Sequence, residues 1–332
     1  ELLASVKVIS EGINEIARAT AAGSEGTSYI TEKIIDIKER ADEIKSETDD
    51  TEELKLKTRI ISGVIGFLLL IAVVLSPQIV LGVAVSIMAL MALYEFFRAV
   101  SHAGCKPVKT LGYLSCIPLL LIGVTGYGDD SSRLDWLSKP NILLFSIFVM
   151  MLFLLMVTVF LHDKFNIIDA AVTALGILYI PFFFLFLILI RKFDGGQYFI
   201  WFVFIGAWLT DTAAYFSGMA LGKTKIVPEI SPKKTLEGSI GGVIGCIIAT
   251  IIYGMSVNMY IGYIPAYHFI IVGLINGILS QIGDWVASAI KRYTGIKDFG
   301  SIMPGHGGVL DRFDSILFIA PVVYFYIDFI IL

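Results

Sequence analysis

The sequence predicts an all-α, polytopic integral membrane protein preceded by a helical head. Of the 332 residues, 56% are apolar, above the roughly 45–50% of soluble domains, and the mean hydropathy is +0.81. The charge is uneven, because residues 1–59 hold 14 acidic and 9 basic side chains whereas the remainder holds 15 and 16. We therefore expect an acidic head, residues 1–53, and a sparsely charged membrane domain, residues 54–332.

Apolar or small residues recur in the head in steps of three and four, from Ile9 to Ile44. This heptad spacing predicts a coiled coil, or a helical hairpin because residues 20–27 include no large apolar side chain. An acidic stretch, residues 47–53, separates the head from the body. Residues 1–48 resemble a fragment of a bacterial chemoreceptor signalling domain, which suggests a fused segment; a native helical extension is the alternative.

The body contains about nine apolar segments of membrane-spanning length. Their approximate bounds are 60–76, 78–98, 110–126, 141–161, 167–190, 198–220, 238–257, 267–290 and 315–332. If the head is cytoplasmic, fifteen basic residues fall in cytoplasmic segments and four in outer loops. This positive-inside bias predicts a cytoplasmic N-terminus, cytoplasmic active-site loops and an outer C-terminus.

The eighth apolar segment carries Asp284, Ser288, Lys291 and Arg292 at positions i, i+4, i+7 and i+8, which share one helix face. Asp284 lies about two turns inside the cytoplasmic end of this helix. A carboxylate at that depth can bind a metal ion or act as an acid, and the two cations can hold phosphate. For Asp284, an ion pair between helices is the alternative.

The loop after this segment places Gly305, Gly307 and Gly308 around His306. Glycine lets backbone N–H groups approach an anion closely, and a histidine among them can bind phosphate or transfer a proton. The alternative is a plain turn.

Asp311 and Asp314 lie one helical turn apart at the start of the ninth segment, with Arg312 between them. Two carboxylates so spaced suit Mg²⁺, which keeps water ligands for a phosphate substrate. Negative charge also suits a helix N-terminus, so capping alone is an alternative explanation for Asp314.

A second group of polar residues begins in the sixth apolar segment, where Asp211 and Tyr215 are one turn apart. An acid inside a membrane segment indicates a functional site by default. The loop that follows contains hydroxyl and ammonium groups that can bind a polyphosphate, and one carboxylate. These residues are Ser231, Lys233, Lys234, Thr235 and Glu237. An ordinary positive-inside loop is the alternative.

Together these features predict two cytoplasmic loops, rich in basic, glycine and hydroxyl residues, that meet three or four carboxylates at the membrane surface. Metal-assisted phosphoryl or nucleotidyl transfer needs that combination. The placement implies one water-soluble substrate and one lipid. The sequence has neither a Walker loop nor a kinase signature, so the pattern alone does not identify the nucleotide.

One long motif resembles a known family. It reads Ser288-x-Ile290-Lys291-Arg292-x4-Lys297-Asp298-x-Gly300, then Pro304-x-His306-Gly307-Gly308-x-x-Asp311-Arg312-x-Asp314. It resembles the signature of the phosphatidate cytidylyltransferase (CDP-diacylglycerol synthase) family, and residues 211–218 and 231–238 are similar to that family's upstream motifs. The resemblance covers roughly residues 55–332. Its departures, Ala213, Leu236 and Met303, remove no polar group.

The resemblance implies an enzyme, a nucleotidyltransferase of phospholipid biosynthesis, that converts CTP and phosphatidate into CDP-diacylglycerol and pyrophosphate with Mg²⁺. It implies that Asp284 and Asp311 bind metal with support from Asp314. Catalytic roles are implied for Asp284, Asp311, Lys291, Arg292 and His306. Substrate binding is implied for Asp211, Tyr215, Ser231, Lys233, Lys234, Thr235, Glu237, Ser288, Lys297, Asp298, Gly305, Gly307, Gly308 and Arg312.

The resemblance also implies a second cation such as K⁺, a homodimer in a bacterial inner membrane, and no nucleic acid partner. Two other interpretations stay open. One is a CTP-dependent transferase acting on another lipid, such as an ether-lipid phosphate or a polyprenol. The other is an ion-coupled transporter using Asp211 and Asp284, which predicts an internal repeat that the sequence does not show.

Overall fold

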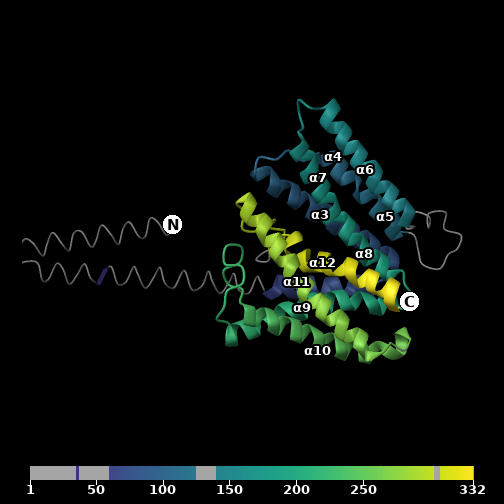
Figure 1. Cartoon of the computed structure of the whole chain (residues 1–332), viewed down its shortest axis with the longest axis vertical. Coiled ribbons are helices and arrows are strands. Elements are labelled where there is room, and N and C mark those ends of the chain that lie inside the picture. The colour runs from purple at the N-terminus through teal and green to yellow at the C-terminus, as the bar shows by residue number, and fades with distance from the viewer. Residues whose placement is uncertain (1–34, 37–59, 125–139, 263, 303–306, 332) are drawn as a thin grey trace, which may run out of the picture. The chain divides into compact units, whose positions relative to one another are not determined.

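The computed structural model describes residues 35–36, 60–124, 140–262, 264–302 and 307–331. The chain forms two compact units, residues 1–64 and residues 65–332, and the second contains every helix labelled in Figure 1. Apart from residues 35–36, the predicted head lies outside the described residues. Its coiled coil and its boundary after residue 53 therefore stay predictions.

The part of the chain that the structure describes is helical and contains no strand, which confirms the all-α class. The labelled helices are α3 (Gln78–His102), α4 (Lys109–Leu114), α5 (Cys116–Val124), α6 (Pro140–Phe160), α7 (Ile167–Tyr179), α8 (Pro181–Arg191), α9 (Gly196–Leu221), α10 (Leu236–Ile261), α11 (Ala266–Thr294) and α12 (Leu310–Tyr326), followed by the π-helix η2 (Ile327–Ile331).

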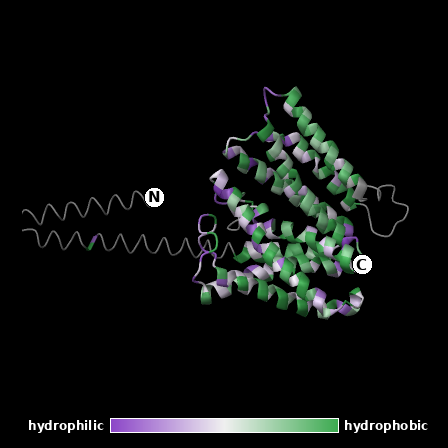
Figure 2. Cartoon of the chain, viewed as in Figure 1, coloured by the Kyte–Doolittle hydropathy of each residue, from purple (hydrophilic) through white to green (hydrophobic). Residues whose placement is uncertain are grey.

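Among the residues that the structure describes, six helical segments are long and apolar enough to cross a membrane, which supports the polytopic architecture. They are Gln78–His102, Ile167–Arg191, Gly196–Leu221, Leu236–Ile261, Ala266–Thr294 and Leu310–Ile331. Three further apolar helices, Ile60–Leu75, Lys109–Val124 and Leu144–Phe160, are shorter. Hydrophobic residues dominate the helices in Figure 2, whereas hydrophilic residues gather in the loop after α9. The total of nine spans stays a prediction.

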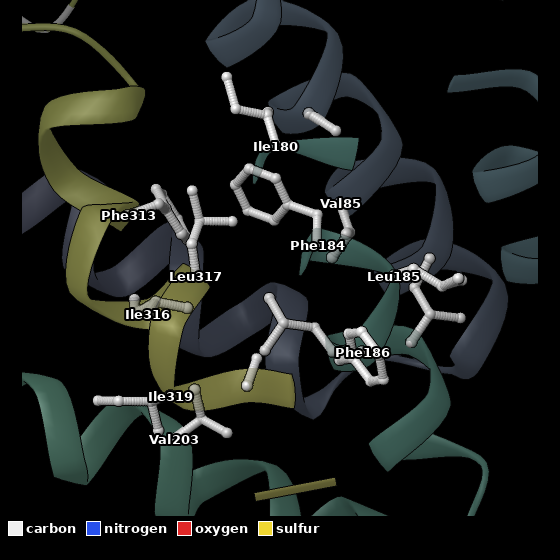
Figure 3. Packing of buried hydrophobic residues seen from close by; sticks show 14 of the residues in the cluster. Val85, Ile180, Phe184, Leu185, Phe186, Val203, Phe313, Ile316, Leu317 and Ile319 are labelled. Carbon is white, nitrogen blue, oxygen red and sulfur yellow. The ribbon is translucent and has the colours of Figure 1, made fainter. Parts of the chain in front are cut away.

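Helix α8 lies at the centre of the core, between α3 and α12. It is separated from α7 at Pro181, because proline has no N–H to continue the hydrogen bonding of the preceding turn. Figure 3 shows Phe184 of α8 beside Phe313 and Leu317 of α12, with the two phenylalanine ring centroids 5.5 Å apart. This packing fixes the start of α12 against the membrane core.

Helices α9 and α10 pack closely through small residues, as membrane helices commonly do. A Cβ added at Gly242 of α10 would lie 2.9 Å from the Cβ of Ala214 in α9, and one at Gly238 would lie 2.9 Å from the Ala214 carbonyl oxygen. The close approach brings the first turn of α10 against the C-terminal half of α9. That half carries Asp211 and Tyr215.

Helices α3 and α5 also cross at paired glycines, and this contact predicts an effect on stability. A Cβ at Gly82 would lie 2.5 Å from the Cα of Gly123, which is backbone and has no rotamer to change. We expect Gly82→Ala to destabilise the protein by about 1–3 kcal/mol, the usual range for overpacking. Thermal unfolding in detergent checks this.

The matched control is Gly66→Ala, because a Cβ at Gly66 meets nothing within 4 Å. Alanine favours helix over glycine by about 1 kcal/mol, so this variant should unfold at or above the wild-type temperature. Equal unfolding temperatures for the two variants would contradict the close helix crossing.

Candidate active site

A cavity of about 580 Å³ lies where α9, the loop of residues 222–235, α10, α11 and α12 meet. Twelve of the residues predicted from sequence line it: Asp211, Tyr215, Ser231, Lys233, Lys234, Thr235, Asp284, Lys291, Asp298, Asp311, Arg312 and Asp314. The structure thus brings the two predicted groups of polar residues together, although 73 positions separate Asp211 from Asp284 in the sequence. The described residues of the lining include four basic and five acidic side chains.

Lys234 is a cation of this cavity on which several acids act. Its ammonium group pairs with the Asp284 carboxylate, and the charges of Asp211 and Asp314 also act on it. Burial lowers the pKa of Lys234, and the negative charges of Asp211 and Asp314 oppose the shift. The ring of Trp285 lies 6.0 Å from the ammonium nitrogen. One ammonium group therefore balances several carboxylates that converge from α9, α11 and α12.

The loop that carries Lys234 is held by residues on the first turn of α10. The Thr235 hydroxyl accepts a hydrogen bond from the Gly238 N–H at 3.2 Å and caps the helix. The Glu237 carboxylate accepts from the N–H of Lys223 at 3.0 Å and from the N–H of Thr224 at 3.1 Å. Glu237, predicted to bind substrate, does not line the cavity; its carboxylate closes the loop.

Asp311, at the start of α12, joins three parts of the site. One carboxylate oxygen accepts a 2.7 Å hydrogen bond from Lys291 of α11. The other accepts from the backbone N–H groups of Phe299 and Gly308, at 2.8 and 3.0 Å. The Asp311 side chain is only 3% exposed. Asp311 therefore fixes the loop between α11 and α12 as well as facing the cavity.

The donor set fits a magnesium ion bound partly by substrate. In the described part of the chain, no three acidic, histidine or cysteine side chains form a preassembled metal cluster. Mg²⁺ commonly uses one or two carboxylates and completes its octahedron with water and substrate phosphates. Asp284 and Asp314 line the cavity and offer oxygen ligands of that kind. Asp311 is already engaged by two N–H groups and an ammonium group, so its carboxylate is less open to a metal.

Of the remaining predicted residues, those that the structure describes do not line the cavity. The Ser288 hydroxyl is 3.5 Å from an Asp284 carboxylate oxygen, and Arg292 donates to the Ile230 carbonyl oxygen at 3.2 Å. Arg292 thus ties the end of α11 to the loop that carries Lys234. Others that do not line it are Lys297, Gly307 and Gly308. Gly305 and His306 lie outside the described residues.

Sequence reasoning missed several lining residues, among them Gln281 and Ser239, which hydrogen-bond to each other through their side chains. Gln281 lies one turn before Asp284 and also donates to the Gly277 carbonyl oxygen at 2.8 Å. An uncharged amide in an apolar helix was the available signal, since polar groups in membrane segments need partners. The sequence prediction began this helix face at Asp284 and did not extend it back to Gln281.

The chain is similar to known proteins of one family. Residues 57–330 match the Cytidylyltransferase family. The chain is 35% identical over 273 residues to a phosphatidate cytidylyltransferase of Bacillus subtilis, covering 81% of this chain and 97% of that protein. It is 35% identical over 268 residues to the protein of the same name from Staphylococcus haemolyticus, and 34% identical over 270 residues to that of Staphylococcus aureus. Each comparison covers 81% of this chain and 97% of the relative.

The matched region includes the whole cavity, and residues 1–56 lie outside the family match. The resemblance inferred from the motifs is confirmed: the chain belongs to the cytidylyltransferase family.

Proposed function

We propose that the protein is a phosphatidate cytidylyltransferase, which transfers CMP from CTP to phosphatidate and releases pyrophosphate. The observation that carries the proposal is the cavity of four basic and five acidic side chains at one end of an apolar helix bundle, within the family match. The names of the relatives support the same reaction. Charged groups beside apolar helices suit a reaction between a water-soluble nucleotide and a membrane lipid.

The charge balance of the cavity supports a requirement for Mg²⁺. Among the lining residues that the structure describes, five carboxylates stand against four cations, a formal charge of −1. Both CTP and phosphatidate are anionic, so the protein's own charges do not neutralise them. Mg²⁺ held by Asp284 and Asp314, with Asp311 in support, would supply the missing positive charge.

In this proposal the basic side chains bind the phosphates of the substrates and stabilise their charge during the transfer. A phosphatidate oxygen forms a bond to the α-phosphorus of CTP while the bond to the bridging oxygen breaks, and pyrophosphate leaves. Lys234, Lys291 and Arg312 stabilise the negative charge on the phosphates as this happens. Phosphatidate is already anionic at neutral pH, so the reaction needs no separate general base. Lys233 and Ser231 lie on the same cavity wall and bind the polyphosphate.

Finer features of the assembly are also proposals. The excess of basic residues in alternate loops supports nine spans, a cytoplasmic cavity and an outer C-terminus in a bacterial inner membrane. The heptad pattern in the head supports a homodimer. A second cation such as K⁺ is proposed from the family resemblance alone.

Removing one carboxylate tests the proposed metal site. We expect Asp284→Asn to lower kcat/KM for CDP-diacylglycerol formation by at least about 100-fold, because the amide is a neutral and weaker metal ligand. Formation of CDP-diacylglycerol by purified protein in detergent is the measurement. Glu229→Gln is the control, since Glu229 is exposed and outside the cavity. Full activity of Asp284→Asn would refute this site.

Removing one ammonium group tests the charge balance. We expect Lys234→Met to lower kcat/KM by about 100-fold or more, because it leaves Asp211, Asp284 and Asp314 without their shared cation. Lys225→Ala removes an exposed cation of the same loop that does not line the cavity and should retain wild-type turnover. An equal loss in both variants would show that only the overall charge of the loop matters.

Chelation tests the cation requirement directly. We expect product formation to stop in excess EDTA and to return when Mg²⁺ is added beyond the chelator, because the anionic substrates need a divalent cation in this cavity. Unchanged turnover in EDTA would contradict the proposal. Adding monovalent salts to the chelated protein is the control for ionic strength.

A further inference from the structure

Glu95 of α3 is a buried acid that does not line the cavity. It is 1% exposed and lies within a helix long and apolar enough to span a membrane. A carboxylate there is costly unless hydrogen-bond donors surround it. Its partners therefore indicate why this position carries an acid.

The carboxylate of Glu95 accepts hydrogen bonds from the first N–H groups of α12. One oxygen accepts from Val309 at 3.0 Å and the other from Leu310 at 2.9 Å. N–H groups at a helix start have no acceptor within their own helix, and Val309, at the N-cap position, makes no side-chain cap bond. An acid more than 200 positions earlier in the chain therefore caps α12, where the helix dipole favours negative charge.

Two glycines of the family motif make room for this carboxylate. A Cβ on Gly300 or on Gly308 would overlap the Glu95 carboxyl group. The three atoms nearest to a Cβ added at Gly308 all belong to Glu95, and the φ angle of Gly308 is not positive. Space, rather than backbone conformation, therefore requires glycine there. Gly308 was predicted to shape a phosphate loop, but its N–H donates to Asp311 and its Cα faces Glu95.

The segment that Glu95 holds is the one that presents charge to the cavity. Asp311 and Arg312 are on the first turn of α12, and both line the cavity. Arg98, almost one turn after Glu95, donates to the Phe299 carbonyl oxygen at 3.2 Å. Helix α3 therefore contacts the loop between α11 and α12 at two described places, Phe299 on the α11 side and Val309 on the α12 side.

We propose that Glu95 is a positioning residue for cytidylyl transfer, which sets the start of α12 so that Asp311 and Arg312 face the substrates. Glu95 touches no substrate and acts through α12. The effect on turnover rests on the proposed function, whereas the contact between Glu95 and Gly308 does not. The two parts can therefore be tested separately.

The test is a double-mutant cycle between Glu95→Ala and Gly308→Ala, read as kcat, KM for CTP and unfolding temperature. We expect each single variant to lower kcat at least tenfold, because each displaces the first turn of α12. The double variant should be no worse than Glu95→Ala alone, since without the carboxylate the new Cβ has space. Additive losses in both kcat and unfolding temperature would overturn the contact.

Gly307→Ala is the matched control. Gly307 has a φ of +83°, and a Cβ there would face Asp311 rather than Glu95. We therefore expect the losses of kcat and unfolding temperature in Gly307→Ala to add fully to those in Glu95→Ala when the two substitutions are combined. A Gly307→Ala loss that Glu95→Ala also relieves would show general loosening of the loop and overturn the specific coupling.

Glu95→Gln separates positioning from stability, because glutamine keeps the volume and one acceptor oxygen but replaces the other oxygen by a donor. We expect its kcat to fall at least tenfold, while its unfolding temperature stays closer to wild type than that of Glu95→Ala. Wild-type kcat in Glu95→Gln and in folded Glu95→Ala would make the role purely structural and overturn the proposal. If wild-type protein formed no CDP-diacylglycerol, the proposed function would fail, and the unfolding cycle would still decide the contact.

Discussion

The carboxylates at one end of the apolar helix bundle need hydrogen-bond donors or cations as partners, and the rest of the structure depends on this constraint. Asp284 meets Lys234, and Asp311 meets Lys291 and two backbone N–H groups. Glu95 meets the first N–H groups of α12. A buried charge without such partners would be strongly destabilising. These pairings also fix the relative positions of α3, α11 and α12, so the same interactions that make the acids tolerable build the cavity.

The apolar core provides the rigid support for those pairings. Helix α8 packs on both α3 and α12, and Phe184 contacts Phe313 directly after the first turn of α12. Close α9–α10 packing at Gly238 and Gly242 places the loop carrying Lys234 over the end of α11. The charged residues can be presented accurately because they project from packed helices or from a loop that Thr235 and Glu237 hold closed.

Much of the candidate site could be predicted from local sequence. Asp284 and Lys291 share a helix face by spacing alone, and both line the cavity. Glu95 could not be found in this way, because its partners lie more than 200 positions away and only tertiary packing brings them together. The role of Gly308 was also open to two interpretations. Its sequence context suggested a loop that binds substrate anions, whereas in the described residues the N–H groups of Gly308 and Val309 donate to the protein's own carboxylates, those of Asp311 and Glu95. The apolar segments were predictable from hydropathy, whereas the break before Pro181 within the fifth of them needed the structure.

The central claim is that the cavity transfers the cytidylyl group of CTP to a lipid phosphate. The most direct measurement follows two samples of CTP, labelled at the α- or at the γ-phosphorus, through reaction with phosphatidate on purified protein. The account predicts that the α-label enters CDP-diacylglycerol while the γ-label leaves as pyrophosphate in equal amount. Transfer of the γ-label to lipid, or no labelled lipid from a folded preparation, would contradict it.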